Sequence, residues 1–112
     1  MKRSFTFDPQ TLKDPGKVLQ GIENGIRHLH ELNLVHNDLN PSNVMLLHDD
    51  TPVIIDFDSC RQIRQSLEGV GRTYEWHDED VRISLPSNDL DALSEIREWL
   101  SDKVTKKYQF KE

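Results

Sequence analysis

The chain contains two segments in which apolar residues recur every three or four positions, the spacing of one helix face. At the start of the first segment, Asp14 precedes Pro15, and Asp at an N-cap followed by Pro at the first helical position is a common helix start. Asn33 is a residue type that often ends a helix, because Asn readily adopts the left-handed backbone conformation found there. We therefore predict a helix from residue 15 to about residue 32, with one apolar face formed by Val18, Leu19, Ile22, Ile26 and Leu29.

A second helix is predicted near the other end of the chain, with Ser87 or Asn88 as its cap. Asp89 and Asp91 then fall in the first turn, where the helix dipole favours negative charge. We expect this helix to extend to about Asp102, with a frayed tail after it. Its buried face is predicted to consist of Leu90, Leu93, Ile96 and Leu100.

Two short apolar runs between the helices have the length of β-strands. They cover residues 44–47 and 53–55, and the polar residues 48–52 between them are typical of a turn, so we predict a small hairpin. Residues 59–86 are polar and contain Gly69 and Gly71, which predicts a long functional loop rather than a packed element. Together these elements indicate a mixed α+β fold that is mainly α.

The composition bounds the size of the fold and the nature of its partners. A chain of 112 residues with 35% apolar residues allows one domain with a small core, which a protein partner or a second copy would help to complete. The net charge of -6 argues against nucleic-acid binding. The one cysteine, Cys60, fits a reducing compartment, and no apolar run has the length of a signal peptide or membrane span. We therefore expect a cytoplasmic protein, small enough to diffuse into the nucleus, that binds no membrane.

The most specific chemical pattern is the string H-N-D-L-N-P-S-N, which runs from His36 to Asn43. Asp38 and Asn43 precede the first strand-like run, and Asp56 follows the second. Two carboxylates and an amide supply the oxygen ligands that suit Mg²⁺ bound together with phosphates. An Asp beside such a metal can orient or deprotonate an attacking hydroxyl. Loops are rich in Asp and Asn for turn reasons as well, but the whole string favours an active-site loop.

This pattern resembles the eukaryotic protein kinases, whose catalytic loop reads H-R-D-L-x-x-x-N and whose metal loop reads D-F-G. The resemblance implies that Asp38 is the catalytic base, and that Asn43 and Asp56 hold Mg²⁺ and thereby ATP. It also implies that His36 packs under the metal loop and that Asp89 holds the catalytic loop by hydrogen bonds. Residues 71–76, G-R-T-Y-E-W, look like the end of an activation segment. A group of fungal kinase-like proteins has a similar pattern there and in the I-D-F-D-S-C string at residues 55–60.

The resemblance covers about residues 15–101 and implies a partial kinase C-lobe, so we expect residues 1–112 to form a single partial domain without the N-lobe and the late C-lobe helices. Three residues depart from the family pattern. Asn37 replaces the Arg that pairs with a phosphorylated activation loop, and Asp58 replaces the Gly of D-F-G. Asn40 is a candidate catalytic residue because it stands where serine/threonine kinases place a Lys that meets the transferred phosphate. It brings no cation to a site whose catalysis is mostly electrostatic.

Three functions fit these observations. The first is an ATP- and Mg²⁺-dependent phosphotransferase. Its ancestral acceptors are Ser and Thr residues of proteins, and the isolated chain is weakly active or inactive. The second is an inactive pseudokinase-like module that binds a protein partner or a second copy through uncovered apolar surface. The third is a small-molecule kinase of the aminoglycoside or choline type, which shares the H-x-D-x-x-x-x-N loop. Residues 71–76 favour the protein-kinase side.

Overall fold

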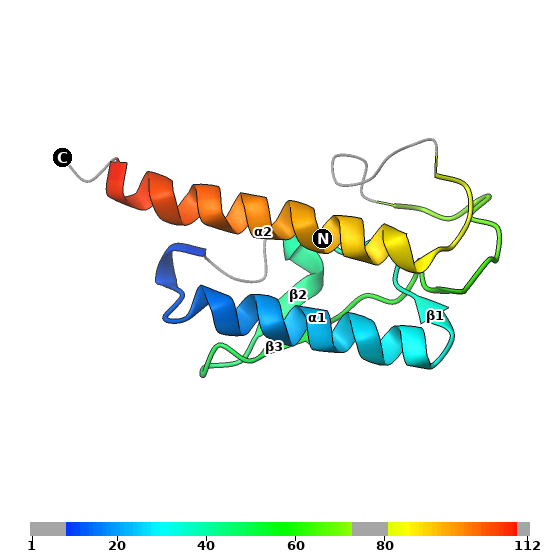
Figure 1. Ribbon diagram of the computed structural model, residues 1–112, viewed down its shortest axis with the longest axis horizontal. Coiled ribbons are helices and arrows are strands. Elements are labelled where there is room, and N and C mark those ends of the chain that lie inside the picture. Colours follow the sequence, from blue (N-terminus) through cyan, green and yellow to red (C-terminus); the bar gives the residue numbers. More distant parts are fainter. Residues whose placement is uncertain (1–8, 73–80, 110–112) are drawn as a thin grey trace.

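The computed structural model describes residues 9–72 and 81–109 and contains two long helices that lie side by side and run in opposite directions (Figure 1). Helix α1 spans Pro15–Glu31 and helix α2 spans Pro86–Gln109. The remaining regular elements of the described residues are short: η1 (Pro9–Thr11), β1 (Leu34–Val35), η2 (Pro41–Asn43), β2 (Val44–Leu46), β3 (Pro52–Ile54) and β4 (Arg61–Gln62). This mixed, mainly helical architecture confirms the predicted fold class. No helix among the described residues is long and apolar enough to span a bilayer.

Helix α1 begins and ends where the sequence predicts. The Asp14 side chain accepts a hydrogen bond from the backbone N–H of Lys17 at 3.1 Å, and Pro15 occupies the first turn. Leu32 is the C-cap, and Asn33 follows it with a φ of 63°, the left-handed conformation that ends a helix. The fully buried residues of the predicted apolar face are Val18, Ile22 and Ile26.

Strands β2 and β3 form the predicted hairpin, and α1 packs directly on it through two glycines. A Cβ atom added to Gly21 would lie 2.4 Å from Cγ of Pro52, and one added to Gly25 would lie 2.8 Å from Cδ1 of Ile54. The helix therefore approaches the hairpin more closely than any residue with a side chain would allow. The antiparallel register pairs Val44 with Ile54, Met45 with Val53 and Leu46 with Pro52.

The turn of the hairpin is fastened to the start of α1. Oδ2 of Asp50 accepts hydrogen bonds from the backbone N–H groups of Lys13 (2.8 Å) and Asp14 (3.1 Å). Nζ of Lys17 donates to the carbonyl oxygen of Asp49 at 2.7 Å. The hairpin is thus held at its turn by polar contacts and along its strands by packing.

The described parts of this region, residues 59–72 and 81–86, are more ordered than the predicted loop. Arg61 and Gln62 pair antiparallel with β1, and Ser66 forms an isolated bridge with Ile83. Leu67 is buried. The prediction of an unpacked loop was wrong here because a two-residue strand of polar residues has no detectable period, while its backbone pairs with β1 all the same.

Helix α2 starts earlier and ends later than predicted. It begins at Pro86, whose missing N–H costs nothing at a first helical position. The backbone N–H of Asn88 donates to the carbonyl oxygen of Leu85 at 2.9 Å, so Leu85, and not Ser87 or Asn88, precedes the first turn. The helix then continues to Gln109, past the expected end near Asp102.

The buried face of α2 also differs from the prediction at one position. Leu90 was expected in the core, yet it is 48% exposed, whereas the neighbouring Asp89 is fully buried. A one-residue step turns the helix by about 100°, so the buried stripe starts at the carboxylate and leaves Leu90 outside. The other buried residues of α2, among its described side chains, are the polar Asn88 and the apolar Ala92, Leu93, Ile96 and Leu100.

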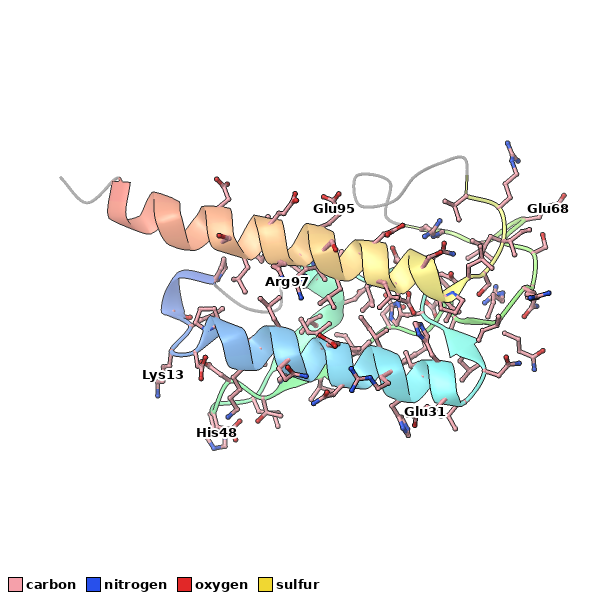
Figure 2. The ribbon with its side chains drawn as sticks, viewed as in Figure 1. Lys13, Glu31, His48, Glu68, Glu95 and Arg97 are labelled. Carbon is pink, nitrogen blue, oxygen red and sulfur yellow. The ribbon has the colours of Figure 1, made fainter. Side chains whose placement is uncertain are left out.

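The hydrophobic core lies between the two helices and the hairpin. Side chains crowd into this space, while the labelled Glu31 and Glu95 project outward from α1 and α2 (Figure 2). Leu39 is also fully buried in the core, which anchors the loop that precedes the hairpin. The core residues are Val18, Ile22, Ile26, Leu39, Val44, Ala92, Leu93, Ile96 and Leu100.

The close approach of α1 to the hairpin predicts opposite signs for two glycine substitutions. Gly21→Ala should lower the free energy of unfolding, because overpacking against the rigid Pro52 ring costs up to about 3 kcal/mol and outweighs a helix-propensity gain of about 1 kcal/mol. Gly16→Ala should keep the gain, since its added Cβ would meet only Oδ1 of Asp14 at 3.5 Å. Urea denaturation measures both changes. An equal stabilisation by both substitutions would contradict the packing described.

The corrected face of α2 predicts a contrast between two apolar residues. Ile96→Ala should lower the free energy of unfolding by about 2–5 kcal/mol because it opens a cavity in the core. Leu90→Ala, at an exposed position, should change it by no more than about 0.5 kcal/mol. Chemical denaturation of the two variants under the same conditions gives the comparison, and similar losses would place Leu90 in the core after all.

Candidate active site

The carboxylate of Asp89 holds the loop at residues 36–43 in place. Its Oδ2 accepts the backbone N–H of His36 at 2.9 Å, and its Oδ1 accepts the backbone N–H of Asn37 at 2.9 Å. Nε2 of His30 on α1 lies 3.0 Å from Oδ2. Asp89 is in the first turn of α2, where the helix dipole stabilises a negative charge. This buried carboxylate therefore joins α1, the loop and α2 at one point.

The imidazole of His36 connects the loop to the residues after β3. Its Nδ1 accepts a hydrogen bond from the backbone N–H of Asp38 at 3.1 Å, so the neutral ring carries its proton on Nε2. Nε2 lies 3.0 Å from the carbonyl oxygen of Ile55, to which it donates. The ring also meets Phe57 edge-on, with 5.3 Å between centroids. His36 thus packs between Asp38 and the segment that carries Asp56.

The loop is closed by two asparagine amides that bond to the same carbonyl group. Nδ2 of Asn40 and Nδ2 of Asn43 both donate to the carbonyl oxygen of Asp38, at 3.0 and 2.7 Å. Nδ2 of Asn43 also lies 3.4 Å from Oδ2 of Asp38. Oδ1 of Asn40 accepts the backbone N–H and the hydroxyl of Ser42, so its amide caps η2. A role of Asn40 toward a transferred phosphate stays a prediction.

The backbone brings Asp56 to the same end of the hairpin as Asn43. The backbone N–H of Ile55 donates to the carbonyl oxygen of Asn43 at 2.9 Å, and Asp56 is the next residue. Asp56 is half-buried and has a φ of 62°, a left-handed conformation that Asp tolerates better than most residues. Backbone strain of this kind clusters at functional sites. Asp38, Asn43 and Asp56 therefore gather where β2 begins and β3 has ended.

The donor set at this end of the hairpin consists of two carboxylates and one amide. Within residues 9–72 and 81–109 no group of three or more His, Cys, Asp and Glu is placed to hold a metal ion. Asn43 turns its amide nitrogen toward Asp38, and an amide binds a cation through its oxygen. The set is thus all-oxygen, which is the preference of Mg²⁺.

Residues 71–76 lie only partly within the described residues. The hydroxyl of Ser59 donates to the carbonyl oxygen of Gly71, and Nε of Arg72 donates to the carbonyl oxygen of Asn37 at 2.5 Å. The start of this motif therefore rests against the loop at residues 36–43. The rest of the motif, residues 73–76, lies outside the described residues.

Cys60, four residues after Asp56, is placed as an unreactive thiol. Burial raises its pKa, the nearby carboxylate of Asp89 raises it further, and the guanidinium of Arg61 only partly offsets both. A thiol whose pKa is raised carries little thiolate near neutral pH, and the thiolate is the reactive form.

The roles of three residues in this region were not predicted from the sequence. His30 was given no role in the site, although it lies one turn after the buried Ile26 on α1, and that position was a usable signal. Asn88 was interpreted as a cap, yet it is buried and its Nδ2 donates to Oδ1 of Asn37 at 3.0 Å. Two further partners of the Asn37 amide, Ser59 and Ser84, are 22 and 47 residues away, so no local pattern could indicate them.

Comparison with known proteins identifies the family. A family model described as the protein kinase domain matches residues 1–79, a range that contains the loop and Asp56 and ends before Asp89. Over 65 residues, or 54% of the chain, the sequence is 40% identical to the serine/threonine-protein kinase/endoribonuclease IRE1 of Hypocrea jecorina. It is 36% identical over 55 residues, or 45% of the chain, to human IRE2 of the same description, and 40% identical over 50 residues, or 42% of the chain, to human serine/threonine-protein kinase H1.

The matched segments cover only 5%, 6% and 12% of these three relatives' own lengths. The family match itself covers well over half of the 112 residues and spans the H-N-D-L-N-P-S-N and I-D-F-D strings. The resemblance predicted from those strings is therefore confirmed, and the chain belongs to the protein kinase domain family.

Proposed function

We propose that the chain carries the Asp–Asn–Asp part of a site for Mg²⁺- and ATP-dependent phosphoryl transfer, with Ser or Thr hydroxyls of proteins as the acceptor class. The supporting observation is the convergence of three segments at one end of the hairpin. Asn43 bonds to Asp38, and the pairing of Asn43 with Ile55 brings Asp56 alongside. The relatives are described as serine/threonine-protein kinases, which supports protein as the acceptor.

The residues present fit a magnesium ion in their chemistry. Asp56 and Asn43 would hold it through a carboxylate and an amide oxygen, with ATP phosphates supplying further oxygens. When bound, Mg²⁺ neutralises the negative charge that develops on the transferred group. His36 contacts both neighbours of Asp56, through a hydrogen bond to the carbonyl oxygen of Ile55 and an edge-on contact with the ring of Phe57.

Asp38 is the proposed base for the acceptor hydroxyl. Its backbone is fixed from both sides, because its N–H donates to His36 and its carbonyl oxygen accepts from Asn40 and Asn43. The half-buried carboxylate can then accept the hydroxyl proton at a defined position. In other phosphoryl transfers an Asp at this place accepts the proton of the attacking hydroxyl and orients that hydroxyl.

The proposed activity of the isolated chain is weak. Asn40 places a neutral amide where the family pattern has a Lys, and phosphoryl transfer depends mostly on positioning and electrostatic stabilisation. The amide of Asn40 serves the loop itself through Asp38 and Ser42. Loop geometry and catalytic charge are thus separate properties in this chain.

One observation favours a second candidate function, self-association or binding of a protein partner. Met45 and Val53 are directly opposite each other in the hairpin and are 45% and 41% exposed. Leu47, on the same side of the strand as Met45, is 48% exposed. A cross-strand apolar pair that faces outward forms a patch that another chain could cover.

Two isosteric substitutions should separate binding from transfer. Asp56→Asn should reduce the Mg²⁺-dependent part of the ATP affinity at least about tenfold, a loss of about 1.4 kcal/mol, because one anionic ligand is lost. Asp38→Asn should leave that affinity unchanged and lower the transfer rate by about 10²–10⁴. Calorimetry with ATP and Mg²⁺ and radiolabel transfer to a general protein substrate give the two readouts.

Asp49→Asn, in the exposed hairpin turn, is the matched control and should change neither quantity. Transfer that is indifferent to Asp38→Asn would remove Asp38 from the mechanism. Phosphorylation of choline or an aminoglycoside, with none of protein, would assign the chain to small-molecule kinases instead.

The apolar patch predicts an effect on oligomeric state. The double variant Met45→Lys and Val53→Lys should abolish self-association, because it places charges on the surface that pairing would bury. Leu32→Lys, which changes a 56% exposed residue at the other end of α1, should leave self-association intact. Sedimentation equilibrium over a range of concentrations measures this. A wild-type chain that is monomeric throughout would count against the second candidate.

A further inference from the structure

We infer that Asn37 is a positioning residue whose neutral amide clamps the segment after the metal loop against the catalytic loop. The clamp follows from the contacts of Asn37 alone. Its effect on nucleotide chemistry rests on the proposed function, because the clamped segment begins three residues after Asp56.

The side chain of Asn37 bonds to three separate parts of the chain. Its Nδ2 lies 3.1 Å from the carbonyl oxygen of Val35, 3.2 Å from that of Ser59 and 2.9 Å from Oγ of Ser84. Its Oδ1 accepts from Nδ2 of Asn88 at 3.0 Å. The partners lie up to 51 residues away along the chain. One amide therefore ties β1, the segment at residue 59 and the start of α2 together.

The orientation of the amide is determined by its surroundings. Two backbone carbonyl oxygens, of Val35 and Ser59, face Nδ2, and an amide oxygen in that place would be repelled by both. The opposite end faces Nδ2 of Asn88, which is a donor and also donates to the carbonyl oxygen of Ile83 at 2.9 Å. Only one of the two amide orientations satisfies all of these groups.

The position calls for a short neutral residue that both donates and accepts. Asn37 is 0% exposed, and an ion at such a depth is costly unless it is paired. Its φ of 70° is left-handed, a conformation that Asn adopts far more readily than most residues with a side chain. Asn meets all of these requirements at once, which gives the replacement of the family's Arg a physical role of its own.

The backbone of Asn37 completes the clamp. Its N–H donates to Oδ1 of Asp89, and its carbonyl oxygen accepts from Nε of Arg72. Ser59, held by the Asn37 amide, in turn donates its hydroxyl to the carbonyl oxygen of Gly71. Both ends of the segment from residue 59 to residue 72 are thus held near Asn37 by bonds that involve no phosphate.

Hydrogen exchange of this segment tests the clamp in protein that carries no phosphate. The reporters are the backbone amides of Cys60, Arg64 and Leu67, which are hydrogen-bonded in the structure. We expect them to be protected in the wild-type chain after phosphatase treatment. Asn37→Gly keeps the left-handed backbone and removes the amide, and it should speed their exchange by about tenfold or more, with the amides of α1 unchanged.

Asn33→Gly is the matched control, because Asn33 has a similar φ of 63° but is exposed at the end of α1. It should leave the exchange rates of all three reporters unchanged. Ser84→Ala removes one acceptor of the Asn37 amide and is mild enough to keep the fold, and it should speed exchange of the same reporters by a smaller factor. If Asn37→Gly fails to fold, Ser84→Ala alone decides the clamp.

Reporter exchange that is unaltered by both Asn37→Gly and Ser84→Ala would overturn the clamp. So would a wild-type segment that becomes protected only after phosphorylation. The positioning role has its own readout, which is a weaker Mg²⁺-ATP affinity of Asn37→Gly at a temperature where the variant is folded. An unchanged affinity would overturn that role. Absence of Mg²⁺-ATP binding by the wild-type chain would contradict the proposed function alone, since the exchange rates decide the clamp independently.

Discussion

A single buried carboxylate, that of Asp89, organises the loop that carries the proposed site. It accepts the consecutive backbone N–H groups of His36 and Asn37 and meets the imidazole of His30. Hydrogen bonds to a charged group contribute about 1.5–3 kcal/mol each, and an ion left buried without them would be costly. The backbone of the loop therefore has one well-defined position relative to both helices. The side chains of the loop are positioned accordingly.

The two residues that Asp89 holds reach different partners. The imidazole of His36 supports Asp38 and the residues on both sides of Asp56, so it serves the proposed metal site. The amide of Asn37 reaches Ser59, Ser84 and Asn88, so it serves the segment that follows. One anion thus fixes two backbone positions. The neutral side chains of these two residues then form the hydrogen bonds that hold the rest of the region in place. Neutral hydrogen bonds suit this task because they can be buried without an uncompensated charge.

Local signals made much of the fold predictable. Asp14, Pro15 and Asn33 mark the ends of α1 through their own backbone and capping preferences, which act within a few residues. The hairpin followed from two apolar runs around a turn. The packing role of the glycines in α1 could not be predicted, because Gly21 inside a helix signals only a propensity cost until Pro52 of the hairpin is seen against it. Leu90 was misplaced for a related reason, since hydrophobicity alone favours it over Asp89 for the buried stripe.

The site was predictable as a set of residues but not as a network. The order and spacing of Asp38, Asn43 and Asp56 indicated their convergence through the resemblance to kinases, and the structure brings them to one end of the hairpin. Their catalytic roles stay a prediction. Asn37 shows where sequence reasoning stops, because it could be interpreted only as the absence of an Arg. The clamp that its amide forms depends on groups 22 to 51 residues away, which only the folded chain brings together.

The geometry of the loop and its chemical competence have different physical origins, and this separation bears on all three candidate functions. The amide nitrogens of Asn40 and Asn43 both donate to the carbonyl oxygen of Asp38, and Leu39 is buried in the core. None of these contacts requires a nucleotide, a metal ion or a phosphate, so the loop keeps its shape whether or not phosphate is transferred. Activity depends instead on charge, where Asn40 replaces a cation. A preserved loop is therefore expected of a kinase and of a pseudokinase alike, and the electrostatics around Asp38 and Asp56 decide between them.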